Sequence, residues 1–479
     1  MFTATPGMFV ADMQGLVLNA ADFGFSPSSS ASQNNTAIAA AITAITPSGG
    51  IIFVPPGTYK IATPISISAA NITLAGSGAG TILQPTANFS GSQIILITAD
   101  FCSVRDLTIA YANTTYSANP AVDGIRITGC RSGTIFNVYL NYINGWAIHS
   151  TATVSIANYW WQFVNAHAFQ CASGMRIAGN TGSSFNMAHS VTNCIMDQIQ
   201  NSDAYLFEDA HDVLCTNMQG SVTAGTGNTL HVKGAAAAIY VSNVDLGPAP
   251  GPATSPTILI ESGANGSPKQ VTFNAGIIEG GATGVTISAG TQLRVVDCDI
   301  INNGTHGINI TGGDAIVIEG CLFNLNGSTA GAGRYDFQSS TANHVEVNDC
   351  YFLTPVGSLT QQTNNAVNVT AGTVVLQNDT FSGVGYNSGN IFNSFPSIIH
   401  NCPGYNPLGN FSNGAVGASP FTFPTKSTDN TVFVAGGTVS AIAIGGVATG
   451  LTAGTFRVPA QQTFTITHTG APTTTWFGD

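Results

Sequence analysis

The chain has few charged residues, and this scarcity excludes several classes of protein. Only 7% of its 479 residues are charged, with 11 Lys and Arg against 23 Asp and Glu. The net charge of −12 disfavours nonspecific binding to nucleic acid or to anionic lipid, so neither partner is expected. Long Lys- and Glu-rich stretches of helical period are also missing, which argues against a helical fold.

Targeting signals and metal-binding motifs are absent as well. The N-terminal stretch MFTATPGMFVADMQG lacks the basic start and apolar core of a signal peptide, and no apolar run of about 18 residues follows. We therefore expect a soluble protein that is not Sec-exported. The nine cysteines are odd in number and show no CxxC or CxH spacing, so we expect free thiols packed as small apolar residues, with no structural metal and no cofactor.

What the chain does have is glycine, with 55 residues, and an internal repeat built on turn residues. Segments such as VVDCDI, VIEGCLF and VEVNDCYF share the form apolar, any, turn residue, small or apolar, any, apolar. Most of the central residues are Asn or Asp, which tolerate the left-handed conformation of a sharp bend. The predicted turn positions are Asp106, Asn137, Asn158, Asn193, Cys215, Asn243, Asn274, Asp297, Gly320, Asp349 and Asn378.

Apolar residues recur two positions before each turn and three positions after it. The position two residues after the turn holds both polar and apolar residues. This is the alternation of strands that are buried on one face. Repeats of roughly 20 to 35 residues with short strands are typical of a parallel solenoid. Cys194, Cys298, Cys321 and Cys350 fall on its inward column, and His189 and His211 are predicted to stack in another.

The N-terminal segment reads as a cap for this solenoid. Asn34 or Asn35 is placed to begin an Ala- and Ile-rich helix that ends before Pro47, and the strand pair IIFVPPGTY follows. A helix there covers the open apolar end of the first coil.

The motifs AADFGF, NNTAIAAAI, GGIIFVPPGTYKI and ITLAGSGAGTIL resemble the N-terminal part of the pectate-lyase superfamily, especially bacteriophage tailspikes. Together with the repeats, the resemblance covers about residues 17–402 and implies an all-β, right-handed parallel β-helix. The Asp-rich loop that often precedes the helix is replaced here by SPSSSASQNN. Of the polygalacturonase pattern only His306-Gly307 is present, without the paired Asp-Asp or the Arg-x-Lys.

The chain is predicted to divide into four parts: an N-terminal extension (1–16), the β-helix (17–402), a Pro- and Gly-rich linker (403–420) and a small C-terminal β domain (421–479). A domain of this size with few charges often gains stability by association, so a trimerisation module is one interpretation. An independent monomeric β-sandwich is the other.

Exposed positions two residues after the turns provide the first candidate site. Tyr139 and Trp160 are predicted to be surface neighbours, and Asp245 and Asp299 to lie about 10 Å apart with Gly276 between them. Aromatic rings stack on sugar faces, and inverting hydrolysis uses carboxylates about 6.5–9.5 Å apart. Asn217 falls in the same predicted column. The alternative is that this surface packs against another subunit.

A second candidate is the acidic stretch NSDAYLFEDAHD (201–212). It contains Asp203, Glu208, Asp209 and Asp212, of which the last three are candidate catalytic acids or bases. It lacks the alternating ligand spacing of a calcium loop. A solvated acidic loop is the alternative.

The resemblance implies a homotrimeric tailspike or tail-fibre protein that binds a host-surface polysaccharide. Whether the protein also depolymerises this polysaccharide is left open by the sequence. Such a protein is assembled in the host cytoplasm, joins other phage tail components in the virion and acts at the host cell surface. Two alternatives stand beside it: a non-catalytic adhesive or structural β-helix, and a bacterial polysaccharide lyase or glycoside hydrolase.

Overall fold

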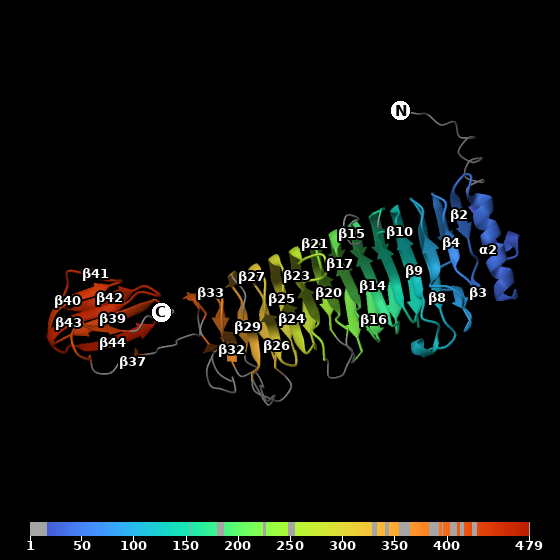
Figure 1. The fold of residues 1–479 in the computed structure, drawn as a ribbon. Coiled ribbons are helices and arrows are strands. Elements are labelled where there is room, and N and C mark those ends of the chain that lie inside the picture. Colours follow the sequence, from blue (N-terminus) through green and yellow to red (C-terminus); the bar gives the residue numbers. More distant parts are fainter. Residues whose placement is uncertain are drawn as a thin grey trace, which may run out of the picture.

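Strands in the first 400 residues pair in parallel, each with the equivalent strand of the next coil, so that the chain winds into a solenoid (Figure 1). The computed structural model describes residues 17–153, 155–179, 186–223, 227–247, 254–327, 333–340, 344–353, 365–382, 392–394, 396–402, 410–411, 416–423 and 429–478. The predicted N-terminal extension (1–16) lies outside them. Among the described residues, no helix has the length and hydropathy needed to span a bilayer.

The larger sheet contains 23 described strands and forms two sides of the solenoid. Its strands are β1 (Val17–Asn19), β2 (Gly50–Phe53), β3 (Gly57–Ile61), β5 (Ile72–Ala75), β6 (Thr81–Pro85), β8 (Ser103–Ala110), β10 (Arg131–Asn141), β12 (Asn158–Val164), β13 (His167–Phe169), β15 (Asn186–Thr192), β16 (Ile195–Ile199), β18 (Ala210–Thr216), β19 (Gln219–Val222), β21 (Ala237–Leu246), β23 (Lys269–Glu279), β25 (Thr291–Ile301), β27 (Asp314–Glu319), β28 (Leu322–Asn324), β30 (His344–Asn348), β31 (Tyr351–Leu353), β33 (Thr373–Gln377), β34 (Thr380–Phe381) and β36 (Ile398–His400).

A second parallel sheet, of 13 described strands, forms the remaining side. Its strands are β4 (Ile65–Ile67), β7 (Gln93–Ile97), β9 (Asp123–Thr128), β11 (Trp146–Thr151), β14 (Ser173–Ala178), β17 (Tyr205–Glu208), β20 (Leu230–Lys233), β22 (Ile258–Glu261), β24 (Thr283–Ile287), β26 (His306–Ile310), β29 (Tyr335–Ser339), β32 (Asn365–Val369) and β35 (Phe392–Ser394). We call its outward surface the ionic face, for the charged residues described below.

A row of left-handed bends separates the two sides of the larger sheet, and we call it the asparagine row. Every member has a positive φ. Asparagine amides bond along it, for example from Asn137 to Asp106 at 2.9 Å and from Asn217 to Asn193 at 3.0 Å. The row consists of Asp106, Asn137, Asn165, Asn193, Asn217, Asn243, Ala275, Asp297, Gly320, Asp349, Asn378 and Asn401.

Eight of the eleven predicted turn positions are therefore correct, and those at Asn158, Cys215 and Asn274 are wrong. The bends of these coils lie at Asn165, Asn217 and Ala275. At Cys215 the alternating apolar residues fit equally well after a shift of two, so the pattern alone does not set the register there. Asn158 is instead buried at the start of β12, where its Oδ1 accepts a hydrogen bond from the Cys130 N–H at 2.8 Å.

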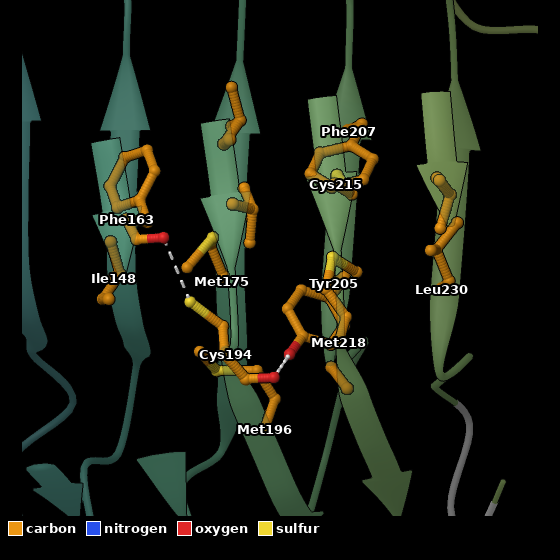
Figure 2. Packing of buried hydrophobic residues seen from close by; sticks show 14 of the residues in the cluster. Ile148, Phe163, Met175, Cys194, Met196, Tyr205, Phe207, Cys215, Met218 and Leu230 are labelled. Atoms are coloured by element: carbon orange, nitrogen blue, oxygen red, sulfur yellow. Dashed lines mark hydrogen bonds between the residues drawn. The ribbon is translucent and has the colours of Figure 1, made fainter. Parts of the chain in front are cut away.

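Inward side chains of all three sides fill one continuous core. The predicted inward cysteines Cys194, Cys298, Cys321 and Cys350 are buried, and all nine cysteines are free. In Figure 2 the Cys194 thiol points to the carbonyl oxygen of Phe163, while the Tyr205 hydroxyl donates to the Cys194 carbonyl. Near the C-terminal end Phe323, Phe352 and Phe381 form a stack, with ring centroids 4.7 and 4.8 Å apart.

The predicted stack of His189 and His211 is wrong. His189 is paired in register with Val213, and His211 with Met187. His189 is buried and accepts a hydrogen bond from the Trp161 N–H, and burial lowers its pKa to about 3. It is a neutral core histidine.

Helix α2 (Ala31–Ile45) covers the N-terminal end of the solenoid, after the 3-10 helix η1 (Ala20–Phe23) (Figure 1). Its N-cap is Ser30, which forms a capping box with Gln33, so the prediction of Asn34 or Asn35 is wrong. Asn34 and Asn35 instead bond the solenoid: the Asn34 side-chain amide donates to the Lys60 carbonyl, and Asn35 Oδ1 accepts from the Ala62 N–H. A second 3-10 helix, η2 (Tyr116–Ala118), lies in a later connection.

The C-terminal part contains two described four-stranded antiparallel sheets. Trp476, Phe423 and Phe464 are the large rings of its core. Asn410–Phe411, within the predicted linker, pairs with the last strand, and Val416 packs into the core. The strands are β37 (Asn410–Phe411), β38 (Phe421–Phe423), β39 (Asn430–Ala435), β40 (Thr438–Ile444), β41 (Val447–Ala448), β42 (Gly454–Val458), β43 (Phe464–Gly470) and β44 (Thr473–Gly478).

Candidate functional site

A groove runs along the solenoid on the side that follows the asparagine row, and we call this side the groove face. Its outward positions, two residues after each bend, form the column Thr108, Tyr139, His167, Ile195, Gln219, Asp245, Ile277, Asp299, Leu322, Tyr351 and Thr380. Two hollows, of 420 and 520 Å³, share the lining residues Ile195, Gln219 and Asp245. Because they share residues, they form one groove that crosses several coils.

Carboxylates from three coils line the 520 Å³ hollow. Asp197, Asp245 and Glu279 are its acidic residues. The Ser221 hydroxyl donates to Asp197 Oδ1 at 2.6 Å, and the Gln219 side-chain amide donates to Asp245 Oδ2 at 3.5 Å. The arrangement offers several hydrogen-bond acceptors beside the apolar side chains of the groove.

His167 stands at one end of the same hollow. Its Nε2 atom is buried and has no hydrogen-bond partner among the described residues. Burial lowers the pKa of His167, against the opposing charge of Asp197. The residue is therefore held neutral and has an unused polar atom at the groove.

Asp245 and Asp299 lie on the predicted outward column, but the residue between them is Ile277 and not Gly276. The error follows from the misplaced bend of that coil. Two coil spacings separate their backbones by about 10 Å. Only Asp245 lines the groove. Glu279 lies on the coil next to Asp245, offset by two residues along the strand from its register partner Ile277.

The predicted neighbours Tyr139 and Trp160 are not neighbours. Tyr139 is paired with His167, with ring centroids 5.9 Å apart. Trp160 lies at a different bend of its coil, is 60% exposed and contacts Tyr159 at 5.8 Å. The predicted aromatic pair is therefore split between two edges of the solenoid, because the turn of its coil lies at Asn165.

Asn217 is also displaced from its predicted outward position. It belongs to the asparagine row, where its side-chain oxygen accepts from Asn243. It still lines the 420 Å³ hollow, together with Asn193 and Asn243. Three amides thus form one wall of the groove.

The acidic stretch 201–212 is neither a loop nor one site, because it spans β17, a corner and the start of β18. Asp203 is buried and accepts from Asn228 and His231, whereas Glu208 pairs with an arginine. Asp209 accepts from the Ala235 N–H at 2.6 Å, and Asp212 occupies a left-handed bend. The carboxylates therefore have separate partners and do not form one cluster, and a catalytic role for Glu208, Asp209 or Asp212 stays a prediction. In the described residues no group of three or more His, Cys, Asp or Glu residues is arranged to hold a metal ion.

The ionic face has a second set of polar residues that sequence reasoning missed. Asp123 bonds His149 at 2.8 Å, and Asp203 bonds His231 at 2.9 Å, each through the histidine Nδ1. Partners in each pair are separated by more than 20 positions in the chain, and no local motif marks them. Only the register of β9, β11, β17 and β20 brings them together.

His306, the residue of the isolated His-Gly motif, lies farther along the same sheet on β26. Its Nδ1 accepts a hydrogen bond from the Tyr335 N–H at 3.2 Å, and its ring stacks on Tyr335. Burial and the nearby charge of Arg334 lower its pKa to about 4. These contacts with Tyr335 give His306 a structural role in the packing of adjacent coils.

One family model matches part of the chain, and several solved structures share its fold. Residues 17–209 match the family model described as rhamnogalacturonase A/epimerase, pectate lyase-like. No curated protein sequence is significantly similar to the chain.

Several solved structures share the fold at low sequence identity. The A-module of the mannuronan C-5 epimerase AlgE6 from Azotobacter vinelandii has a TM-score of 0.58 at 16% identity, over 81% of this chain and 99% of that one. The Dettilon tailspike protein has a TM-score of 0.56 at 12% identity, over 100% and 97%. DFA-IIIase from Arthrobacter chlorophenolicus A6 has a TM-score of 0.54 at 14% identity, over 82% and 99%.

Proposed function

We propose that this chain, a pectate-lyase-like parallel β-helix protein, binds a surface polysaccharide along its groove face. The observation that carries the proposal is the groove itself, in which two hollows share three lining residues and cross several coils. Its length suits a polymer better than a single small ligand. Amides and carboxylates supply partners for sugar hydroxyls, and Ile195 and Ile277 supply apolar contacts for sugar rings.

The biological setting that we propose is a phage tailspike or tail fibre. The likeness of the fold to the Dettilon tailspike over almost the whole of both chains supports it. In that setting the protein is a homotrimer, is joined to other tail components in the virion and acts at the host cell surface. The C-terminal antiparallel domain is the candidate trimerisation module.

Hydrolysis is a second candidate function of the groove, and Asp245 with Glu279 is its best carboxylate pair. The two residues line the same hollow from adjacent coils. With about 4.8 Å between strands and about 3.3 Å per residue, their backbones lie about 8 Å apart. Inverting glycosidases use carboxylates about 6.5–9.5 Å apart. Asp299 is the weaker partner because it lies outside the groove. Without hydrolysis the protein remains an adhesive β-helix.

Binding can be tested with an array of bacterial surface polysaccharides and a pair of matched variants. Ile195→Arg fills the centre of the groove, whereas Leu322→Arg places the same side chain in the same outward column, beyond the groove. We expect the first variant to weaken binding at least about tenfold, or about 1.4 kcal/mol, and the second to bind as the wild type does. Equal affinities for all three proteins would refute the groove as the binding site.

Hydrolysis is tested by incubating the protein with each polysaccharide that it binds on the array and measuring the reducing ends that form. Asp245→Asn and Glu279→Gln each remove one carboxylate while keeping the shape of the groove. We expect both to lose at least about 100-fold in rate. If the wild type releases no reducing ends from a polysaccharide that it binds, the hydrolytic function is wrong and binding alone stands.

A further inference from the structure

The side of the larger sheet that precedes the asparagine row has a hollow of its own, and we call this side the preceding face. The hollow has a volume of 610 Å³, larger than either hollow of the groove. It lies across β21, β23 and β25, which are neighbouring strands of the sheet (Figure 1). Because the asparagine row separates the two faces, this hollow is not part of the groove.

An aromatic ring and a guanidinium group lie on the outermost two of these three strands. Tyr240 is 48% exposed, its register partner is Thr272, and Thr272 is paired in turn with Arg294. Two coil spacings therefore place the backbones of Tyr240 and Arg294 about 10 Å apart in one outward column. The hollow thus offers a flat apolar ring and a charged donor to one extended ligand.

Side-chain amides line the hollow beside this column. Gln270 and Gln292 lie at left-handed bends on adjacent coils, with φ of 53° and 57°, and Asn274 lies on the coil of Gln270. The equivalent bends on the coils to either side are Ala238 and Ala315. The two glutamines are therefore a local feature of the hollow, and they supply donors and acceptors that the flanking coils lack.

The charge of this hollow is opposite to that of the groove. Arg294 is the one charged residue among its described lining residues, whereas Asp197, Asp245 and Glu279 are the charged residues of the 520 Å³ hollow. The Arg294 side chain is 52% exposed, and its Nη2 donates to Glu319 at 2.9 Å. Its Nε and Nη1 have no hydrogen-bond partner among the described residues. Two sides of the guanidinium are thus available to an anion.

We propose that this hollow is a second, non-catalytic carbohydrate site, which binds a sugar that carries an anionic group, a carboxylate or a phosphate. The sugar ring stacks on Tyr240, the neighbouring amides bond its hydroxyls, and Arg294 binds the anion. The inference rests on the proposed function only in taking a polysaccharide as the ligand, since the face, the residues and the charge of the sugar are different.

Binding is measured on the full chain with hyaluronate as the carboxylate probe, phosphomannan as the phosphate probe and dextran as the uncharged control. We expect at least one acidic probe to bind more tightly than dextran, with an affinity that falls as salt is added. Ile195→Trp fills the groove without adding a charge, and it should leave the binding of the acidic probe unchanged.

Four variants test the roles of the residues. Arg294→Gln should weaken binding of the acidic probe at least about tenfold, because the anion loses its charged donor. Tyr240→Ala should weaken it about threefold or more through loss of the ring contact. Glu319→Gln should strengthen it about twofold, because a competing carboxylate leaves Arg294. Arg105→Gln is the matched control and should bind as the wild type does, since Arg105 lies on the same face, 41% exposed and paired with a carboxylate at 2.8 Å, but outside the hollow.

The sign of the Glu319→Gln result separates a binding role of Arg294 from a structural one. If the ion pair serves only to hold adjacent coils together, Glu319→Gln and Arg294→Gln weaken binding alike, and the proposed role of Arg294 is overturned. A third occupant of the face is a second copy of this chain. If Arg294→Gln lowers the mass of the protein in solution and leaves glycan binding unchanged, the face is a subunit contact and the second site is refuted.

Failure of this inference is distinguishable from failure of the groove. If neither acidic probe binds, or if dextran binds as tightly as both, the second site is refuted while binding of other polysaccharides by the groove stands. If Ile195→Trp abolishes binding on the array but keeps the binding of the acidic probe, the groove and the second site are independent.

Discussion

Asp379 should make the C-terminal coils lose stability as the pH rises, and Asp379→Asn should remove this dependence. The carboxyl is fully buried. Its Oδ1 accepts from the Cys350 N–H at 2.8 Å, whereas its Oδ2 has no hydrogen-bond partner among the described residues. Burial therefore raises the pKa of Asp379 from its ordinary 3.8 to about 8, so the folded protein carries it protonated at neutral pH.

The magnitude follows from proton linkage. Between pH 4 and 8 the unfolded chain binds less proton at this group than the folded chain does, so the free energy of unfolding falls with rising pH by up to about 1.4 kcal/mol per pH unit. Over the interval from 3.8 to about 8 the loss reaches about 6 kcal/mol. The stability is fully present below the unfolded pKa and is lost as the pH passes the folded pKa.

The assay is urea unfolding of wild type and Asp379→Asn from pH 5 to 9, with hydrogen exchange to locate the affected coils. We expect Asp379→Asn to have the larger free energy of unfolding at pH 9. The difference in free energy of unfolding between the two proteins should become smaller towards pH 5. Because a solenoid unfolds coil by coil, protection should change around β33 and β34 and not at the N-terminal end. Histidine titration affects both proteins equally. Parallel stability curves for the two proteins would refute a buried protonated carboxyl.

Three other predictions concern packing and assembly. Phe352→Ala should cost about 3–5 kcal/mol because it leaves a cavity between two stacked rings, whereas its exposed neighbour Tyr351→Ala should cost less than about 0.5 kcal/mol, both by urea unfolding. Gly133→Ala should prevent normal packing of its coil, since a Cβ there would lie 2.3 Å from the Trp161 ring, and a wild-type melting temperature would contradict this. Light scattering should give three times the chain mass of 49.1 kDa, and a stable monomer would refute the trimer.

Fold class could be predicted from the sequence because every coil of a solenoid repeats the same pattern of buried residues, exposed residues and bends. The equivalents Gly320 and Asp349, for example, predict Asp297 as a bend, and the structure confirms it. Cys321 and Cys350 likewise predict Cys298 as a core residue, which is buried. Each coil buries the same columns against its neighbours, so a single misjudged residue does not alter the overall pattern.

Register, by contrast, could be predicted only in part. An alternating apolar pattern is unchanged by a shift of two residues, and this shift moved Cys215 into the place of Asn217. On the coil of Trp160 the predicted bend, Asn158, is a buried residue of β12, and the left-handed residues are Trp160 and Asn165. Because the bend lies at Asn165, His167 and not Trp160 is the neighbour of Tyr139. Because the bend of the later coil lies at Ala275, the outward residue is Ile277 and not Gly276.

The sequence by itself determined that these residues form stacked parallel coils, because every repeat contains alternating apolar and polar residues and a residue that tolerates a left-handed bend. Only the tertiary structure decided which outward side chains meet, because that depends on the connections between bends, whose lengths vary from coil to coil. Asp245 was found from sequence since it follows a bend by two residues, as predicted. His149 could not be found, because its carboxylate partner Asp123 comes from the coil before it.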